Sequence, residues 1–165
     1  MKKPMHPRSG PFYFRFLIFV IISCTALCAC SAGQQARDEE GIQKTVKDYA
    51  TFLIEANKSR DASPLQGIAD EAVIEKLSLW MAAWEDGNIY LDAEVHTLDV
   101  DTIQIAGQSA VVMTIENWSY LYRNLDTQEV AESRQPVSYR MQYHLEKKEK
   151  GWLITEVTIL KEEQR

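Results

Sequence analysis

The hydrophobic residues of this 165-residue chain change their spacing at Gly87, and this change constrains the fold more than any other feature. Before Gly87, apolar side chains recur every three or four positions, which is the period of an amphipathic helix. These side chains are Ile42, Val46, Tyr49, Leu53 and Ala56, then Ile74, Leu77, Met81 and Trp84. After Gly87 the period falls to two, as in strands. Helices followed by a run of strands predict an α+β fold, with the helices on one face of an antiparallel sheet.

Local signals place the ends of these elements. The first helix is expected over residues 39–58, and Ser63-Pro64 predicts a short helical turn that runs through Ile68. A second helix is expected from about Asp70 to Gly87, where glycine can end it. Turns are expected at Gly107, around Asp126 and at the "EKKEKG" string, with a weaker strand before Pro136. The main strands are predicted over residues 90–105, 110–123, 137–146 and from 152 onward.

All three cysteines, Cys24, Cys28 and Cys30, lie within seven positions of one another. They follow an apolar run, and a thiol in apolar surroundings stays protonated and is a poor metal ligand. No later cysteine or histidine pair could complete a site, so neither a metal nor another cofactor is expected. The run has the layout of an export signal, with four basic residues within 1–15, an apolar stretch over 16–27 and then small residues.

The string Leu27-Cys28-Ala29-Cys30 resembles a bacterial lipobox, which has Leu three positions before the modified cysteine and Ala one before it. The resemblance implies that a signal peptide, residues 1–29, is removed and that Cys30 becomes the lipidated first residue. Residues 30–40 would then hold this cysteine and a short polar tether. Residues 21–24 match the pattern less well. Cys28 is poorer still, because Thr25 stands where an apolar residue belongs.

A lipidated Cys30 would anchor the chain in the bilayer, because two or three acyl chains at about 0.8 kcal/mol per buried methylene bind permanently. Ser31 follows the cysteine where Asp would suggest retention in an inner membrane. The resemblance therefore implies a cell membrane lipoprotein in the outer membrane, with its domain facing the periplasm. The alternative is an uncleaved signal anchor, because residues 16–32 just reach the minimum length for spanning a bilayer.

The charge of the remaining chain excludes one class of partner. Four of the 18 basic residues precede residue 30, which leaves 14 basic against 24 acidic residues and a formal charge of −10. Nucleic acid binding depends on neutralising phosphates, so no nucleic acid partner is expected. The same balance argues against a helix that lies on anionic lipid.

Three strings carry a second resemblance: "VIEKLSLWMAAW", "AVVMTIENWSYLY" and "YRMQYHLEKKEKGWLITEV". They resemble the IMS-type module of chloroplast and cyanobacterial division proteins, a branch of the nuclear transport factor 2-like superfamily. The resemblance implies a curved antiparallel sheet wrapped on helices into a cone over residues 41–165. This chain has a lipoprotein signal where the division proteins have long other domains. Only the module's habit of binding a protein segment is therefore carried over.

Enzymes of that superfamily, such as ketosteroid isomerases and epoxide hydrolases, place an acid or base inside the cone. Glu116, flanked on its strand face by Trp118 and Tyr120, is the candidate carboxylate for such chemistry. Arg140 and His144, which share one face of the next long strand, are its candidate companions. The structural alternative is a cross-strand ion pair between Glu116 and Arg140.

The aromatic residues suggest a binding function. Trp118, Tyr120 and Tyr122 share a face with Glu116 and are the candidate wall of a ligand groove. His96 and His144 are isolated and no metal site is expected there. The sequence therefore predicts a non-catalytic binding module that holds a protein segment or a small apolar ligand. The alternatives are a small enzyme that uses Glu116 and a structural unit that forms homodimers.

Overall fold

The computed structural model describes the backbone of residues 12–164 and the side chains of residues 33–133 and 136–163. The chain divides into two units, Met1–Asp38 and Glu39–Arg165, and the second contains the sheet and the core. Within the described residues, no helix combines the length and the apolar character that crossing a membrane requires.

Helix α1, Phe12–Ser59, includes the segment predicted as a tether. The predicted start of the helix at residue 39 was wrong, because residues 31–40 are already helical. The physical reason is local: Gln, Ala, Arg and Glu are good helix formers, and Gln34 donates a hydrogen bond to Asp38 four residues later. The predicted end at Lys58 agrees with the end of α1 at Ser59.

The second helix lies where the sequence placed it, and the short turn begins as predicted but ends three residues earlier, at Leu65. A 3-10 helix, η1, spans Ser63–Leu65, with Pro64 in its first turn. Helix α2, Glu71–Asp86, begins after Asp70, whose side chain accepts a hydrogen bond from the backbone N–H of Val73 at 3.0 Å. Gly87 follows the last residue of α2, as predicted.

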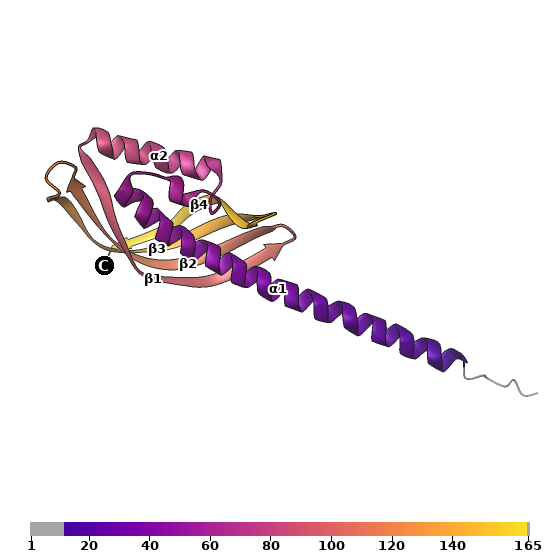
Figure 1. Ribbon diagram of the computed structural model, residues 1–165. Coiled ribbons are helices and arrows are strands. Elements are labelled where there is room, and N and C mark those ends of the chain that lie inside the picture. Colours follow the sequence, from indigo (N-terminus) through magenta and orange to yellow (C-terminus); the bar gives the residue numbers. More distant parts are fainter. Residues whose placement is uncertain (1–11, 165) are drawn as a thin grey trace, which may run out of the picture. The chain divides into compact units, whose positions relative to one another are not determined.

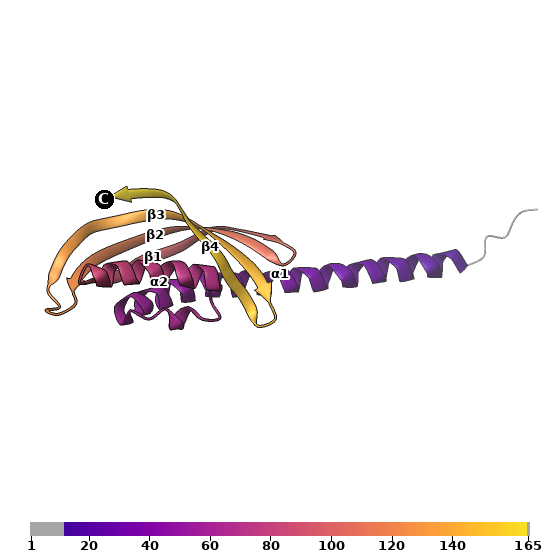
Figure 2. The ribbon, with the colours of Figure 1, turned by 90° about the horizontal axis from the view of Figure 1, so that it is seen from above.

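The four strands form one antiparallel sheet in the order β1-β2-β3-β4 (Figure 1). Each strand pairs with the next in the chain, so β1 and β4 are the two edges. The sheet is long and curved, and Figure 2 shows it arching over the helices. The bounds are Ile89–Ala106 for β1, Ser109–Asn124 for β2, Val130–Lys148 for β3 and Gly151–Gln164 for β4.

The weak strand expected before Pro136 and the strand expected after it are one element, β3. Proline cannot donate to a sheet ladder, which is why the sequence favoured a break there. Pro136 lies in a β-bulge. Val137 pairs with Trp118 and Arg134 pairs with Tyr120, so residues 135 and 136 stand opposite one residue of β2.

The core lies between the concave face of the sheet and the helices. Its central members from different elements include Ile42 of α1, Met81 of α2, Val112 of β2 and Ile154 of β4, all at most 5 % exposed. Burial of such side chains stabilises each by about 1.5–3 kcal/mol relative to exposure. The predicted α+β fold, with helices on one face of a curved antiparallel sheet, is confirmed.

Candidate functional site

A cleft of about 740 Å³ lies between α2 and the concave face of the sheet. Its floor comes from the middle of β2 and β3, and one wall comes from α2. The last turns of α1 close one side through Tyr49, Leu53 and Asn57. On the opposite side, β4 contributes residues 155–159. The cleft reaches the surface, because Trp80 of α2 and Ile159 of β4 line it and are 52 % and 53 % exposed.

Aromatic rings form much of the cleft lining. Trp118 and Tyr120 lie parallel, with centroids 6.1 Å apart, and Tyr139 meets Tyr120 edge to face at 6.3 Å. Tyr122 meets Trp84 of α2 in the same edge-to-face manner at 6.2 Å. Trp118, Tyr120 and Tyr122 therefore line one cleft, and their role in binding stays a prediction. Rings that are fixed by such contacts present apolar surface to a bound molecule and lose little further side-chain freedom when it binds.

Trp80 is a cleft residue that the sequence did not single out. It lies one residue before the core position Met81, and its ring is half exposed at the mouth of the cleft. The Nζ of Lys76, one turn earlier on α2, lies 5.2 Å from the Trp80 ring centroid. A signal was present, because Trp80 lies three residues after Leu77 and four before Trp84, a spacing that places it at the edge of the buried stripe.

Glu116 lies at the floor of the cleft and is 1 % exposed. Its Oε1 accepts hydrogen bonds from Thr114 Oγ1 at 2.6 Å and from Tyr143 OH at 2.7 Å. Its Oε2 accepts one from Trp118 Nε1 at 2.8 Å. A buried carboxylate is costly unless its oxygens are hydrogen-bonded, and here both of them are. The carboxylate is thus engaged by three protein side chains.

The tyrosines around Glu116 are held in their neutral form. Burial is the main cause that raises the pKa of Tyr49 to about 12, and the charge of Glu116 adds to it. Burial followed by the charge of Glu116 also raises the pKa of Tyr143 well above its usual value. For Tyr120, burial and then the hydrogen bond with Tyr139 raise the pKa. A neutral phenol can donate a hydrogen bond to a carboxylate, which is how Tyr143 is used.

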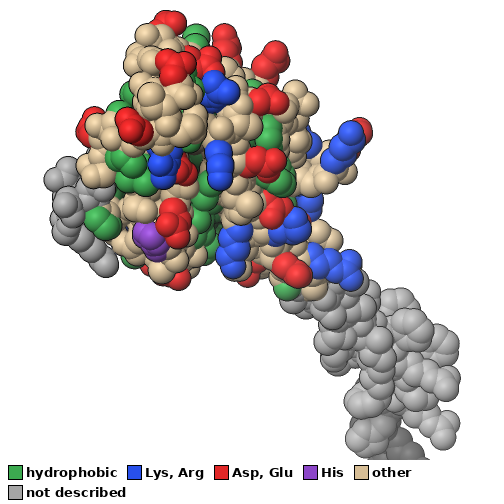
Figure 3. All heavy atoms as spheres, turned by 60° about the vertical axis from the view of Figure 1, so that its left-hand side comes forward, with side chains coloured by type: hydrophobic (Ala, Val, Ile, Leu, Met, Phe, Trp, Pro, Cys, Tyr) green, Lys and Arg blue, Asp and Glu red, His purple; other side chains and the backbone are tan. Residues whose placement is uncertain are grey.

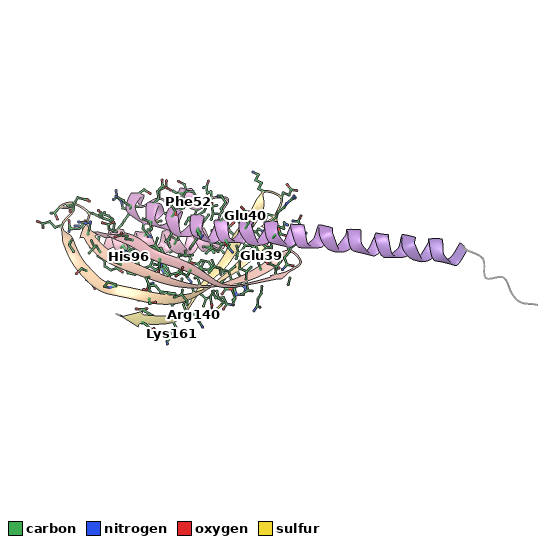
Figure 4. All side chains as sticks on the ribbon, turned by 90° about the horizontal axis from the view of Figure 1, so that it is seen from below. Glu39, Glu40, Phe52, His96, Arg140 and Lys161 are labelled. Atoms are coloured by element: carbon green, nitrogen blue, oxygen red, sulfur yellow. The ribbon has the colours of Figure 1, made fainter. Side chains whose placement is uncertain are left out.

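Two predicted companions of Glu116 lie on the other face of the sheet. Arg140 stands opposite Ile115, is exposed, and forms an ion pair with Asp101 at 3.4 Å. Figure 4 shows Arg140 and Lys161 on the side of the sheet away from the helices. His144 stands opposite Val111, on that same outer face. The predicted pairing of Glu116 with Arg140 and the predicted grouping with His144 were therefore wrong. The register places Tyr139, not Arg140, opposite Glu116, so Arg140 and His144 point to the other face of the sheet.

Asn57 and Lys76 are two of the further polar residues that line the cleft. Asn57 is 4 % exposed and donates through Nδ2 to the carbonyl of Leu53 at 2.8 Å. Its Oδ1 is buried and has no hydrogen-bond partner among the described residues. Lys76 adds one positive charge on α2. A buried acceptor without a partner costs about 1–3 kcal/mol, so a donor brought by a bound molecule would relieve that cost.

The described residues contain no group of three His, Cys, Asp or Glu side chains that could hold a metal ion. Acidic and basic side chains are interspersed on the face drawn in Figure 3, with hydrophobic side chains exposed between them. Cys30, the predicted lipidation site, falls within α1, but its side chain lies outside the described residues.

Comparison with known proteins identifies the family. A family model described as the ARC6-like IMS domain matches residues 38–155. No curated protein sequence matches the chain. Among solved structures, the intermembrane space region of the chloroplast protein ARC6 is similar, with 19 % identity and a TM-score of 0.64 over 72 % of this chain and 93 % of that chain. The structural likeness shows the fold, and the family match spans most of the sequence. The chain therefore belongs to the ARC6-like IMS domain family.

Proposed function

We propose that this protein is a membrane-anchored, non-catalytic binding module of the bacterial cell envelope, and that its cleft holds a segment of another protein. The observation that carries the proposal is the 740 Å³ cleft, lined by aromatic rings and open to the surface at Trp80. Tryptophan and tyrosine are the residues that most often anchor a partner, because each buries a large apolar surface at low entropic cost.

The polar groups of the cleft support a peptide as its occupant. A peptide carries backbone N–H donors at every residue except proline, and one of these could bond to the buried Oδ1 of Asn57. Membership of the ARC6-like IMS family gives independent support for an interaction module. A small apolar ligand would fill the aromatic part of the cleft but would leave Asn57 unsatisfied.

The hydrogen bonds of Glu116 support a structural role over a catalytic one. A general acid or base must reach a proton on the substrate. Both oxygens of Glu116 are occupied by Thr114, Tyr143 and Trp118 from its own and the neighbouring strand. Arg140 and His144 lie on the opposite face and cannot assist. For a homodimer, the centre of the outer face offers Ile115 beside the charged Asp99 and Arg140, which is a poor apolar patch.

The location is also part of the proposal. An acylated Cys30 would hold the domain close to the membrane, and we place it in the outer membrane facing the periplasm. The similar solved structure is the intermembrane space region of ARC6. In that protein, a module of this fold therefore lies between two membranes.

The test is native mass spectrometry of the tagged full-length protein, extracted gently from its own membranes. Ala72 is exposed on α2 and lines the cleft, so Ala72→Trp should narrow the cleft without disturbing the core. Ala82 is exposed on the same helix and lies outside the cleft lining, so Ala82→Trp is the matched control.

We expect a second polypeptide on the wild type and on Ala82→Trp, and its loss on Ala72→Trp. A small molecule that binds the wild type and is lost in Ala72→Trp would show that the cleft binds a small ligand instead of a peptide. A partner retained equally by all three proteins would contradict binding in the cleft.

A further inference from the structure

Strand β4 lines the cleft in an unusual way. Side chains of a strand alternate between the two faces of a sheet, so a cavity on one face normally touches every second residue. Five consecutive residues of β4 line this cleft, from Thr155 to Ile159. The cleft therefore extends along the edge of the strand, where backbone groups as well as side chains are accessible.

The same stretch of β4 has a free backbone edge. Upstream, the edge is covered: the N–H of Asp70 donates to the carbonyl of Ile154, and the N–H of Ile154 donates to the carbonyl of Ile68. Beyond Ile154, the described residues supply no backbone partner on the side away from β3. Ile159 and Leu160 expose about half of their side chains there. An unpaired strand edge beside an apolar cleft is a template for an added strand.

The register of the sheet sets the length of this edge. Irregularities interrupt the pairing of β3 with β4 between His144 and Leu145 and between Arg140 and Met141. Between them, residues 156–159 pair without interruption with residues 144–141. A regular stretch of this kind keeps its outward backbone groups at the spacing that a further strand requires.

Charge favours one kind of segment. Between Thr155 and Glu163, β4 carries Glu156, Glu162 and Glu163 against Lys161 alone, which pairs with Glu163. On the facing helix α2, Lys76 lines the cleft and the four acidic side chains lie outside the lining, so the negative charge beside the edge comes from β4 itself. A segment with Lys or Arg is therefore attracted, whereas the β4 edge of a second copy would bring a net negative charge against the same charge.

We propose that the partner segment binds in extended form as a fifth strand beside β4, with alternate apolar side chains in the cleft and with Lys or Arg residues at its outer positions. This inference rests on the proposed function, since it states how the cleft holds its partner. Main-chain hydrogen bonds to residues 155–159 would supply affinity, and the aromatic lining would select the inserted side chains.

The test uses the full-length protein in detergent to select binders from a random twelve-residue peptide library. The tightest peptide is then synthesised in two N-methylated forms, one methylated at the odd and one at the even backbone nitrogens across its central residues. Only alternate N–H groups of an added strand face its neighbour. We therefore expect one form to lose at least about tenfold in affinity and the other to lose less than about threefold.

A charge test accompanies the register test. The double variant Glu156→Gln with Glu162→Gln should lower the affinity for the peptide by about tenfold at low salt and by less at high salt. The matched control, Glu94→Gln with Glu129→Gln, removes the same charge outside β4 and should change affinity by less than about twofold.

Equal losses in both N-methylated forms, or none in either, would overturn the added strand and leave the proposed cleft binding intact. A homodimer that dissociates when the peptide is added would assign the edge to a second copy and would also overturn the inference. A library that yields no binder would contradict the proposed function itself, and the inference with it.

Discussion

Tyr143 on β3 donates a hydrogen bond to Glu116 on β2 across 2.7 Å, and both side chains are 1 % exposed. The same oxygen, Oε1, also accepts from Thr114 at 2.6 Å. This pair links the two central strands at the floor of the cleft. Because each oxygen of a buried carboxylate needs a donor, the two donors to Oε1 should partly substitute for one another.

The first prediction follows from that redundancy. Tyr143→Phe and Thr114→Val each remove one donor with little change of shape, and each should lower the free energy of unfolding by about 1 kcal/mol. The double variant leaves Oε1 without a donor and should lose about 3–4 kcal/mol, more than the sum of the single losses. Urea unfolding of the four proteins measures this. Strict additivity would contradict the shared role of the two hydroxyl groups.

The second prediction concerns Asn57, whose Oδ1 is buried and has no hydrogen-bond partner within the described part of the chain. Asn57→Leu replaces the amide by an apolar group of similar size and should raise the free energy of unfolding of the isolated protein by about 1 kcal/mol. The same variant should bind the partner segment more weakly, because the acceptor that the segment would satisfy is gone. Thermal unfolding and partner affinity, measured on the same preparation, check both halves. A stabilised variant with unchanged affinity would remove Asn57 from the binding site.

The third prediction is a loss of stability at alkaline pH. Burial, and then the charge of Glu116, raise the pKa of Tyr49 from 10.0 to about 12. The unfolded chain releases this proton near pH 10, while the folded protein keeps it, so the unfolded state binds fewer protons in this window. The stabilisation is complete below pH 10 and is lost as the pH rises toward 12, by about 2–3 kcal/mol for Tyr49. Urea midpoints at pH 9, 10 and 11 should fall, and Tyr49→Phe should flatten the fall. An equal slope in the variant would contradict the assignment.

The fourth prediction tests the anchor. Cys30→Ser should abolish incorporation of labelled palmitate and release the domain from the membrane, because no acyl chain then holds it. Cys28→Ser, two residues away, is the control and should keep both label and membrane. Palmitate label that persists in Cys30→Ser and disappears in Cys24→Ser would identify Cys24 as the lipidated cysteine. Equal membrane retention in all variants, with no label, would favour an uncleaved helix.

Periodicity in the sequence was enough to predict helices followed by strands and the face that each helix buries. The stripe of Ile42, Val46 and Tyr49 is buried in the structure, and so is the β2 face that carries Thr114, Glu116 and Trp118. These patterns are local, because a helix or strand buries one face wherever it packs. The resemblance to the IMS-type module was also confirmed by the family match.

Relations between strands were not predictable in the same way. A shift of one residue in register moves every side chain of a strand to the other face. The sequence shows which residues of β3 share a face, but not which face of β2 they join. Arg140 was therefore placed with Glu116, whereas Tyr139 stands opposite Glu116 and Arg140 opposite Ile115. The edge position of β4 is equally a property of the whole sheet.

The central claim is that the cleft binds a protein segment, and a photo-crosslink at its mouth tests it most directly. A photoreactive phenylalanine placed at Trp80, in the cells that make the protein, should crosslink to a second polypeptide. The same group placed at Leu79 should not, because Leu79 is 65 % exposed and lies outside the cleft lining. A crosslink from position 80 alone is the predicted result. Equal crosslinking from both positions, or none from position 80, would contradict the account.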